Sequence, residues 1–305
     1  MMILNNLLPV FALIGLGTVL NHIHLTSEAF LKTSDRLVYF IFFPAMLFWK
    51  IGSAPPVDNS ATDLVIAALS AVVIVYLISA VCLKLFNVSP FTAGSYSQSC
   101  YRFNTYVGMA VVMNALGEPG VARFGILIGF LIPLINVLAV STLIWYSGQS
   151  ISAGERLRIT LRAMISNPLI IGCLAGMAWS RGVGAFPVFV DNTLGLAAAV
   201  ALPLALLSIG GTLTLNTLKN NMAHACLGSA IKLIVMPIVG WVCLDAVGAS
   251  TLSVKVGMLF FSLPTSSAIV VLSSQLNSDT EFASAAIVLS TLFSFFSMSV
   301  VLSIV

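Results

Sequence analysis

The second half of the sequence repeats the first at an offset of 159 residues, and this repeat constrains the fold more than any other feature. The shift needs no gap, and it also places the polar pair Asn104 and Thr105 on Leu263 and Pro264, where a second hydrophobic stretch is interrupted. A fixed internal period is typical of a duplicated structural unit, so we expect two copies of one fold. Identical residues aligned by the shift are Pro9 and Pro168, Gly17 and Gly176, Pro44 and Pro203, and Gly52 and Gly211.

The composition places both copies in a lipid bilayer. Hydrophobic residues make up 59% of the 305-residue chain and charged residues only 8%, which is too few to cover a soluble protein of this length. The first hydrophobic segment, residues 3–20, can span a membrane and lacks a basic start and a small-residue cleavage site, so we expect a retained helix and not a signal peptide. The net charge of +3 is small and the basic residues form no continuous stripe, which argues against a nucleic-acid partner.

Hydrophobic stretches bounded by charged residues or by Gly, Pro and Asn predict an all-α membrane protein with ten transmembrane helices. Each half holds five spans, an odd number, so the second copy enters the membrane from the opposite side and the 5+5 repeat is inverted. We expect a first repeat over residues 1–148, a short basic cytoplasmic loop over 149–164 and a second repeat over 165–305. The expected spans cover residues 3–20, 35–52, 64–86, 92–116, 121–147, 165–181, 187–215, 223–244, 253–276 and 280–304.

Basic residues set the expected orientation. With the loop over residues 149–164 in the cytoplasm, seven of the basic residues near span ends lie inside and four lie outside. Because cytoplasmic loops are enriched in Lys and Arg, this distribution predicts a multi-pass protein of the cytoplasmic (inner) membrane with both termini outside. The densest basic run, residues 155–162, alternatively serves only as an electrostatic patch on the membrane surface.

The fourth span carries a charge at its centre. Arg102 lies within the hydrophobic stretch 92–116, next to the polar residues Asn104 and Thr105. A lipid-facing Arg there costs about 2.5–3.5 kcal/mol on insertion scales, so we expect Arg102 to face protein or a water-filled cavity. Two interpretations stay open: Arg102 belongs to a functional site, or it binds backbone carbonyls that the helix break leaves free.

The ninth span is interrupted at the matching place. Pro264 has no backbone N–H to continue a helix, and Ser262, Thr265 and Ser266 surround it. Proline after a serine suits a helix start, so we expect half-helices to begin near Thr105 and near Thr265 and to approach each other from opposite leaflets. Each half-helix start carries about half a positive charge. Paired interruptions of this kind are typical of the binding site of a transporter.

Two positive helix ends beside Arg102 predict a site for an anion such as a carboxylate. Lys232, inside the eighth span, either supports the same anion or pairs with a backbone carbonyl or a nearby acid. No Asp or Glu lies near the centre of any expected span, which argues against a cation site built on carboxylates. Sodium held by carbonyls and hydroxyls alone remains an open alternative.

Four local features are distinctive: a Pro in the second span, a Pro in the seventh, Arg-Phe-Asn-Thr at residues 102–105 and Leu-Pro-Thr-Ser at residues 263–266. In these features the chain resembles the auxin efflux carrier family. The resemblance covers essentially the whole chain, and the short central loop is similar to that of bacterial members, among them malonate and malate permeases, rather than plant auxin exporters. The family usually has a Pro at or just after the fourth-helix break, whereas here Gly108 follows with no Pro.

The resemblance implies a fold similar to that of bile-acid and sodium/proton transporters. In that fold, helices 1, 2, 6 and 7 form a scaffold, helices 3–5 and 8–10 form a mobile transport domain, and broken helices 4 and 9 cross. The resemblance also implies organic-acid substrates and a homodimer that associates through the scaffold.

We therefore expect a secondary carrier of small organic anions that works by alternating access in the lipid bilayer and needs no cofactor or metal. A proton or sodium ion as co-transported partner stays open. The substrate is expected between the crossed half-helices and the scaffold, with possible support from Lys232. The expected substrate-binding residues are Arg102, Asn104, Thr105, Tyr106, Pro44, Pro203, Ser262, Pro264, Thr265 and Ser266.

Two other function classes were weighed. An intramembrane enzyme would need a Ser and His pair, but His22, His24 and His224 lie near expected span ends and no Gly-x-Ser-x-Gly motif accompanies them. The two neighbouring His residues also lack a third metal ligand nearby. An anion channel or passive sensor is the main alternative, but channels commonly use rings of charge in multisubunit pores, which an internal inverted repeat does not favour.

Overall fold

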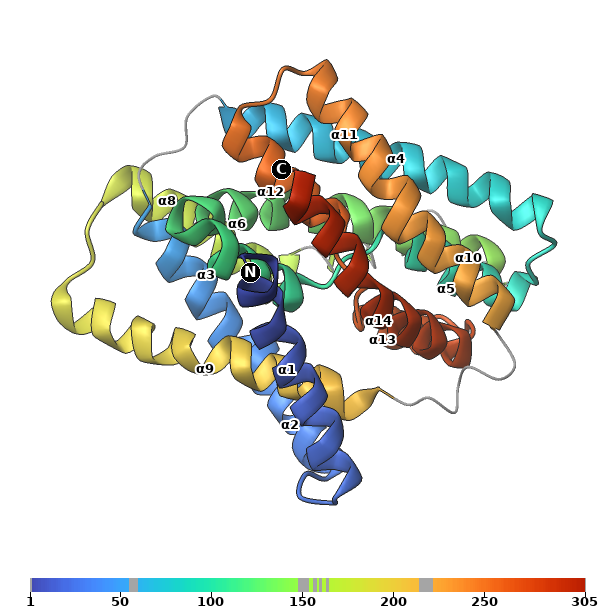
Figure 1. Ribbon diagram of the computed structural model, residues 1–305, viewed down its shortest axis with the longest axis horizontal. Coiled ribbons are helices and arrows are strands. Elements are labelled where there is room, and N and C mark those ends of the chain that lie inside the picture. Colours follow the sequence, from blue (N-terminus) through green and yellow to red (C-terminus); the bar gives the residue numbers. More distant parts are fainter. Residues whose placement is uncertain are drawn as a thin grey trace.

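The computed structural model describes residues 2–54, 60–147, 154–155, 158, 161–162, 165–213 and 222–304, and every regular element in these ranges is a helix (Figure 1). The predicted all-α class is confirmed. Five described segments are long and apolar enough to cross a membrane, so a multi-pass protein is confirmed, whereas the number of ten spans stays a prediction. The segments are Ala61–Leu85, Pro90–Tyr146, Val188–Thr212, Met222–Ala246 and Thr280–Ile304. Most of the expected basic loop lies outside the described residues.

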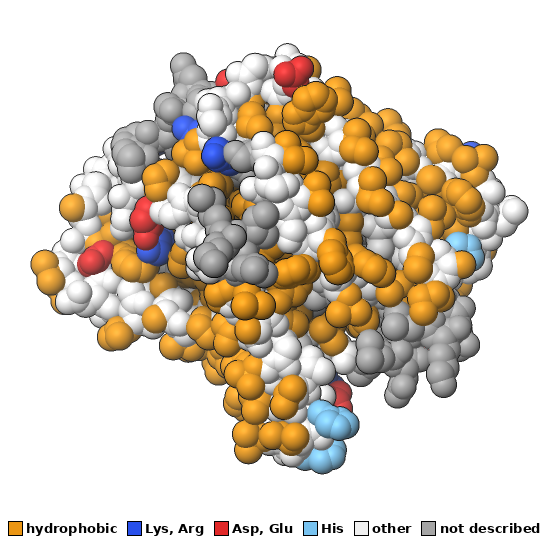
Figure 2. Space-filling model, in the orientation of Figure 1, with side chains coloured by type: hydrophobic (Ala, Val, Ile, Leu, Met, Phe, Trp, Pro, Cys, Tyr) orange, Lys and Arg blue, Asp and Glu red, His pale blue; other side chains and the backbone are white. Residues whose placement is uncertain are grey.

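Hydrophobic side chains cover the surface as well as the core. Figure 2 shows that they spread over much of one face and that charged side chains are sparse there. A helix that is hydrophobic all round suits a lipid environment, because lipid chains solvate its outer face. Exposed examples on five helices are Leu8, Leu77, Leu196, Ile238 and Phe296.

The first helices run longer than the hydrophobicity of the sequence predicts. α1 (Met2–His22) is followed by one continuous helical run made of α2 (Glu28–Leu37), the π-helical η1 (Val38–Phe42) and α3 (Phe43–Gly52). The expected start at residue 35 is therefore wrong by two turns.

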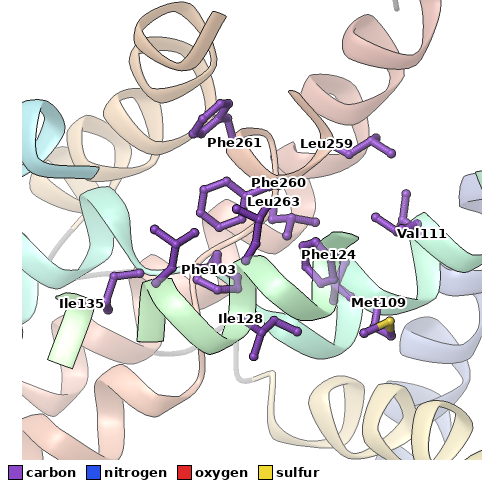
Figure 3. Packing of buried hydrophobic residues seen from close by; sticks show 14 of the residues in the cluster. Phe103, Met109, Val111, Phe124, Ile128, Ile135, Leu259, Phe260, Phe261 and Leu263 are labelled. Carbon is purple, nitrogen blue, oxygen red and sulfur yellow. The ribbon is translucent and has the colours of Figure 1, made fainter. Parts of the chain in front are cut away.

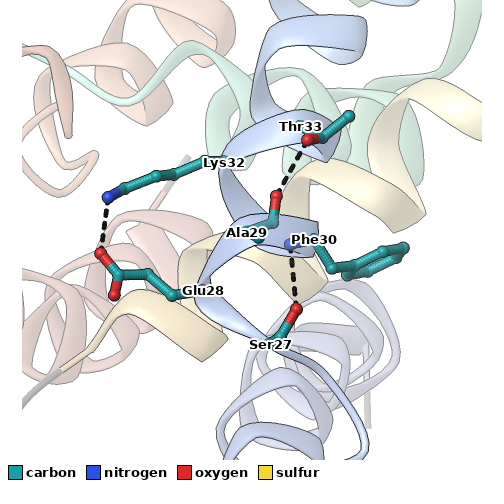
Figure 4. Close-up of polar contacts among 6 residues, drawn as sticks. All are labelled: Ser27, Glu28, Ala29, Phe30, Lys32 and Thr33. Carbon is teal, nitrogen blue, oxygen red and sulfur yellow. Dashed lines mark hydrogen bonds and ion pairs between the residues drawn. The ribbon is translucent and has the colours of Figure 1, made fainter.

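A cap, and not hydrophobicity, begins α2. The Ser27 hydroxyl accepts a hydrogen bond from the Phe30 N–H at 3.2 Å, and Glu28 pairs with Lys32 at 2.6 Å (Figure 4). Capping and an i,i+4 ion pair stabilise a polar helix start that a hydropathy pattern does not detect. As a consequence Asp35 lies inside the helical run, and not at its end as the expected span placed it.

Both π-helical segments end two residues before a proline. η1 precedes Pro44, and η3 (Ile231–Val235) precedes Pro237 in the run formed by α10 (Met222–Ala230), η3 and α11 (Met236–Ala246). A proline lacks the N–H that would bond four residues back, and the wider π turn accommodates this gap without ending the helix.

The fourth and ninth expected spans are both broken. α5 (Pro90–Tyr101) ends before Arg102, and α6 (Thr105–Tyr146) begins three residues later. In the second half α12 (Thr251–Phe261) and α13 (Ala268–Gln275) are separated by residues 262–267. α6 itself contains Gly117 at φ 62°, ψ −159°, so the expected fourth and fifth spans are divided by a kink at this glycine. The remaining elements are α4 (Ser60–Leu85), α8 (Pro168–Gly182), α9 (Val188–Thr212) and α14 (Thr280–Ile304).

Two close contacts at glycines join helices of the first half to helices of the second half. α1 packs on α9 and α3 packs on α8 over the most extensive interfaces in the described structure. A Cβ at Gly17 would overlap the carbonyl oxygen of Leu207, and a Cβ at Gly176 would lie 3.0 Å from that of Phe48. The 159-residue shift takes Gly17 to Gly176 and Phe48 to Leu207, so these two close helix contacts are equivalent.

The helices form two groups. α1, α2, α3, α8 and α9 pack on one another, while α4, α5, α10, α11, α12 and α14 pack among themselves, and α6 and α14 make the principal contacts between the groups. Figure 1 shows α1, α2 and α9 at the lower left and α4, α10 and α11 at the upper right. Of the broken helices, α5, α12 and α13 pack in the second group, while α6 contacts both groups.

Candidate functional site

The two helix breaks touch through direct hydrogen bonds. The Asn104 N–H donates to the Pro264 carbonyl at 2.9 Å, and the Thr265 hydroxyl donates to the Ser99 carbonyl at 3.0 Å. A longer bond of 3.4 Å joins the same hydroxyl to the Arg102 carbonyl. Segments some 160 residues apart in the sequence therefore meet, as the shared offset predicts, and their unwound backbone is buried in protein.

Asn104 begins α6. Its side-chain oxygen accepts hydrogen bonds from the N–H groups of Tyr106 at 3.1 Å and Val107 at 3.2 Å, which is the standard role of an N-cap. The predicted helix start at Thr105 is confirmed. Because the cap occupies two of the free N–H groups, fewer of them remain for an anion than the sequence alone suggested.

The second half-helix begins later than predicted. α13 starts at Ala268 and not near Thr265, because the residues around Pro264 are held by partners outside the helix. The Thr265 N–H donates to the Ser290 hydroxyl of α14 at 3.1 Å. The helix start is served instead by Ser266, whose hydroxyl accepts from the Ala268 N–H at 3.3 Å. Thr265 is fully buried, whereas Ser266 is partly exposed.

Arg102, in the first break, has a buried side chain with a neutral partner. Its side chain is 4% exposed, and its Nη2 donates to the Oδ1 of Asn136 on α6. Its Nε has no hydrogen-bond partner. The ion pairs found in the described part of the chain, Glu28 with Lys32 and Lys50 with Glu118, do not include it. A buried guanidinium without a carboxylate beside it is an unbalanced charge, which is costly unless a ligand or water balances it.

Aromatic rings pack tightly on one side of the crossing. Phe103 lies edge-on to Phe260 with ring centroids 4.6 Å apart, and Phe124 and Leu263 surround them (Figure 3). Gly108 permits this packing, since a Cβ there would overlap Phe124 and lie 2.6 Å from Leu263. These side chains are apolar and buried, so the local dielectric constant on this side of the crossing is low.

Three further buried polar atoms, all on α5, make no hydrogen bond of normal geometry: the Tyr96 hydroxyl, the Gln98 side-chain oxygen and the Tyr101 hydroxyl. The Tyr96 phenol lies next to Cys82 and Cys100, and the Tyr101 phenol lies next to Ser97. Buried polar atoms without partners are uncommon in folded proteins, and water commonly completes their hydrogen bonds.

Lys232 is fully buried and donates from Nζ to the Phe261 carbonyl at 3.1 Å. Phe261 is the last residue of α12, where the helix dipole is negative, so the ammonium stabilises this helix end. Of the alternatives that the sequence left open, pairing with a carbonyl is the contact observed. Support of an anion by Lys232 stays a prediction.

The other expected site residues lie farther apart. Tyr106 lies edge-on to Phe43 with ring centroids 4.7 Å apart, which brings the start of α6 next to Pro44. Pro203 is exposed on α9, and the described contacts do not join it to the crossing. Ser262 is buried, and its hydroxyl donates to the Leu259 carbonyl of its own helix at 2.9 Å.

Sequence analysis missed Asn136 and Ser290. Asn136 carries the sole polar side chain between residues 125 and 140, so its position in a hydrophobic span was an available signal. Ser290 is one of several serines in α14, and no local pattern distinguishes it. No three His, Cys, Asp or Glu side chains of the described residues lie close enough to hold a metal ion.

Comparison with known proteins gives a family and relatives of similar length. The family profile described as "Membrane transport protein" matches residues 2–302. A protein of Rhizobium meliloti (strain 1021) named "Putative malonate transporter" is 24% identical over 291 residues, which cover 94% of this chain and 91% of that protein. An "Uncharacterized transporter" of Methanothermobacter thermautotrophicus is 25% identical over 303 residues, covering 95% of this chain and 94% of that protein.

Proposed function

Because this chain belongs to the membrane transport protein family, we propose that it is a secondary carrier of small organic carboxylates that works by alternating access. Family membership confirms the resemblance to the auxin efflux carriers and identifies the chain as a transporter and not an enzyme. The carrier mechanism and the substrate class are the proposal.

One observation carries the substrate class: Arg102, whose backbone lies where the two broken helices meet, has a buried guanidinium with a neutral partner. Arg102 has a free Nε, and Asn136 supplies no charge to balance it. A carboxylate matches this arrangement, since it accepts paired hydrogen bonds from a guanidinium. We expect Asn104, Thr105 and Thr265, which lie at the junction of the two breaks, to orient the anion.

Malonate is the first substrate to test, because a relative that aligns over almost its whole length is named for it. The proposed site also includes the other expected ligand contacts, which stay predictions. They are Tyr106, Ser262, Pro264 and Ser266, together with Pro44 and Pro203 on the scaffold side. Lys232 remains a proposed source of long-range support.

We further propose the ten-span inverted repeat, with α1, α2, α3, α8 and α9 as a scaffold and the other helices as a transport domain. The equivalence of the contacts Gly17 with Leu207 and Gly176 with Phe48 supports this division. The hydrogen bond between Asn104 and Pro264 supports a crossing that moves as one body. Relative sliding of the two groups then exposes the site first to one side of the membrane and then to the other.

Orientation, assembly and coupling are part of the proposal. We place the carrier in the cytoplasmic membrane with both termini outside, as a homodimer, with a proton or sodium ion as the coupling partner. Asp35 lies inside the helical run from Glu28 to Gly52, and not at its end as the expected span placed it. Its carboxyl is therefore the coupling group that we propose on the scaffold.

The test uses purified protein in liposomes. Uptake of labelled malonate should saturate and should be accelerated by unlabelled malonate inside the vesicles, because counterflow is the signature of a carrier. Arg102→Gln should reduce apparent affinity at least about tenfold, since a charge-assisted hydrogen bond and the site's only guanidinium are lost. Arg181→Gln, a surface change of the same charge at the end of α8, should behave as wild type. Unitary currents without counterflow would instead identify a channel.

A further inference from the structure

We propose that Asn136 is a positioning residue that keeps the charge of Arg102 available to an anion, so that the neutral side chain at position 136 sets the charge selectivity of the site. The inference rests on the proposed function, since it assumes that Arg102 binds the transported anion.

The contact geometry shows how Asn136 acts on Arg102. Asn136 projects from the second segment of α6, beyond the kink at Gly117, and its Oδ1 accepts from Nη2 of Arg102. Asn136 thereby fixes the direction of Nη2, while the neighbouring Nε has no partner. A guanidinium held in place by a single neutral acceptor keeps other N–H donors for a carboxylate.

The choice of an amide has an electrostatic consequence. Buried arginines are normally paired with a carboxylate, and such a pair has no net charge. An amide oxygen accepts the same hydrogen bond but leaves the full positive charge in place. Among the described residues, Tyr39 and Tyr101 are titratable groups near Arg102, and as phenols they are neutral near pH 7. The positive charge at the crossing is therefore left for a bound anion to balance.

Asn136→Asp tests this directly, because the variant has nearly the same shape and adds one negative charge. Malonate binding to the full-length purified protein is measured by titration calorimetry and by the ligand-induced rise in melting temperature. At pH 7.5 we expect affinity to fall at least about tenfold relative to wild type, since the introduced carboxylate competes for Arg102. Asn192→Asp, an exposed change of the same type on α9, should bind as wild type.

Comparison of two variants separates positioning from a purely structural role. Asn136→Leu removes the orienting acceptor without adding charge, so it should bind malonate more weakly than wild type but more tightly than Asn136→Asp, whose carboxylate also neutralises Arg102. The gap between the two variants should be larger for malonate, a dianion at pH 7.5, than for acetate, a monoanion, because the added charge acts on the charge of the ligand. Equal losses in both variants for both anions would show a structural role and overturn the inference.

The remaining outcomes are also decisive. If Asn136→Asp binds malonate as wild type does while Arg102→Gln has lost binding, this inference is wrong and the proposed function stands. If neither wild-type protein nor any variant binds malonate, malate or succinate, the proposed function fails and the inference with it. Should Asn136→Asp not fold, Asn136→Leu decides, because wild-type affinity in that variant excludes a positioning role.

Discussion

The backbone N–H of Asn104 donates to the carbonyl oxygen of Pro264 at 2.9 Å, and this single bond ties the break of one half to the break of the other. Pro264 interrupts its own helix because it has no N–H, yet its carbonyl serves the opposite break. The Thr265 hydroxyl adds bonds to Ser99 and Arg102 in the same direction. Two unwound segments thus satisfy some of each other's backbone groups in a buried region, so each break stabilises the other.

The first prediction concerns Thr265. Thr265→Val keeps the shape of the side chain and removes its hydroxyl, which leaves the Ser99 carbonyl without this donor. We expect a loss of about 1–2 kcal/mol of stability, the range for side-chain hydrogen bonds within membranes. Thr193→Val on α9 is the control, because its exposed hydroxyl bonds only to the Phe189 carbonyl one turn earlier. Melting temperatures in detergent check both, and equal values would show that the crossing does not depend on this bond.

Much of this arrangement follows from local patterns in the sequence. A polar interruption in a hydrophobic stretch marks each break, and Asn104 is a recognisable N-cap, so the start of α6 was predicted correctly. The start of α13 was not, because it depends on Ser290, a partner distant in the sequence that holds Thr265 outside the helix.

A second kind of error arose where hydrophobicity was the only guide. The segment Glu28–Leu37 is polar, yet it is helical because Ser27 caps it and Glu28 pairs with Lys32. Asn136 was overlooked for the opposite reason: a single polar residue barely changes the hydropathy of a span, although its burial beside Arg102 makes it important. Average hydropathy locates spans, whereas caps and isolated polar residues decide their ends and their chemistry.

The second prediction tests the packing of α1 on α9. Gly17→Ala places a methyl group against the Leu207 backbone, which cannot move aside as a flexible side chain can. We expect a loss of about 1–3 kcal/mol, as for other overpacked contacts. Gly15→Ala lies two residues away on the same helix and meets open space, so it should leave the melting temperature unchanged or raise it.

The equivalent contact in the other half gives an internal check. Gly176→Ala would meet the Phe48 carbonyl at 3.0 Å and the Ile51 Cβ at 2.9 Å, so it should also destabilise the protein. If Gly176→Ala and Gly17→Ala were both as stable as Gly15→Ala, close glycine packing would not be what holds these helices together.

The third prediction concerns the ion pair between Lys50 and Glu118. It joins the last turn of α3 in the proposed scaffold to the residue after the Gly117 kink in the proposed transport domain. The Glu118 side chain is 69% exposed, so the pair contributes at most about 1 kcal/mol to stability. Because sliding of the two groups must separate these residues, Glu118→Gln should raise the malonate uptake rate, by up to about fivefold, while hardly changing the melting temperature.

Salt and a charge swap show whether the ion pair itself is responsible. The difference between Glu118→Gln and wild type should shrink as ionic strength rises, because salt screens exposed charges. The double variant Lys50→Glu with Glu118→Lys should return the rate toward wild type, whereas Glu281→Gln, an exposed change in the first turn of α14, should have no effect. A swapped pair that transports as fast as Glu118→Gln would show that the contact does not restrain the movement. A wild-type rate in Glu118→Gln at low salt would lead to the same conclusion, since no restraint would then have been removed.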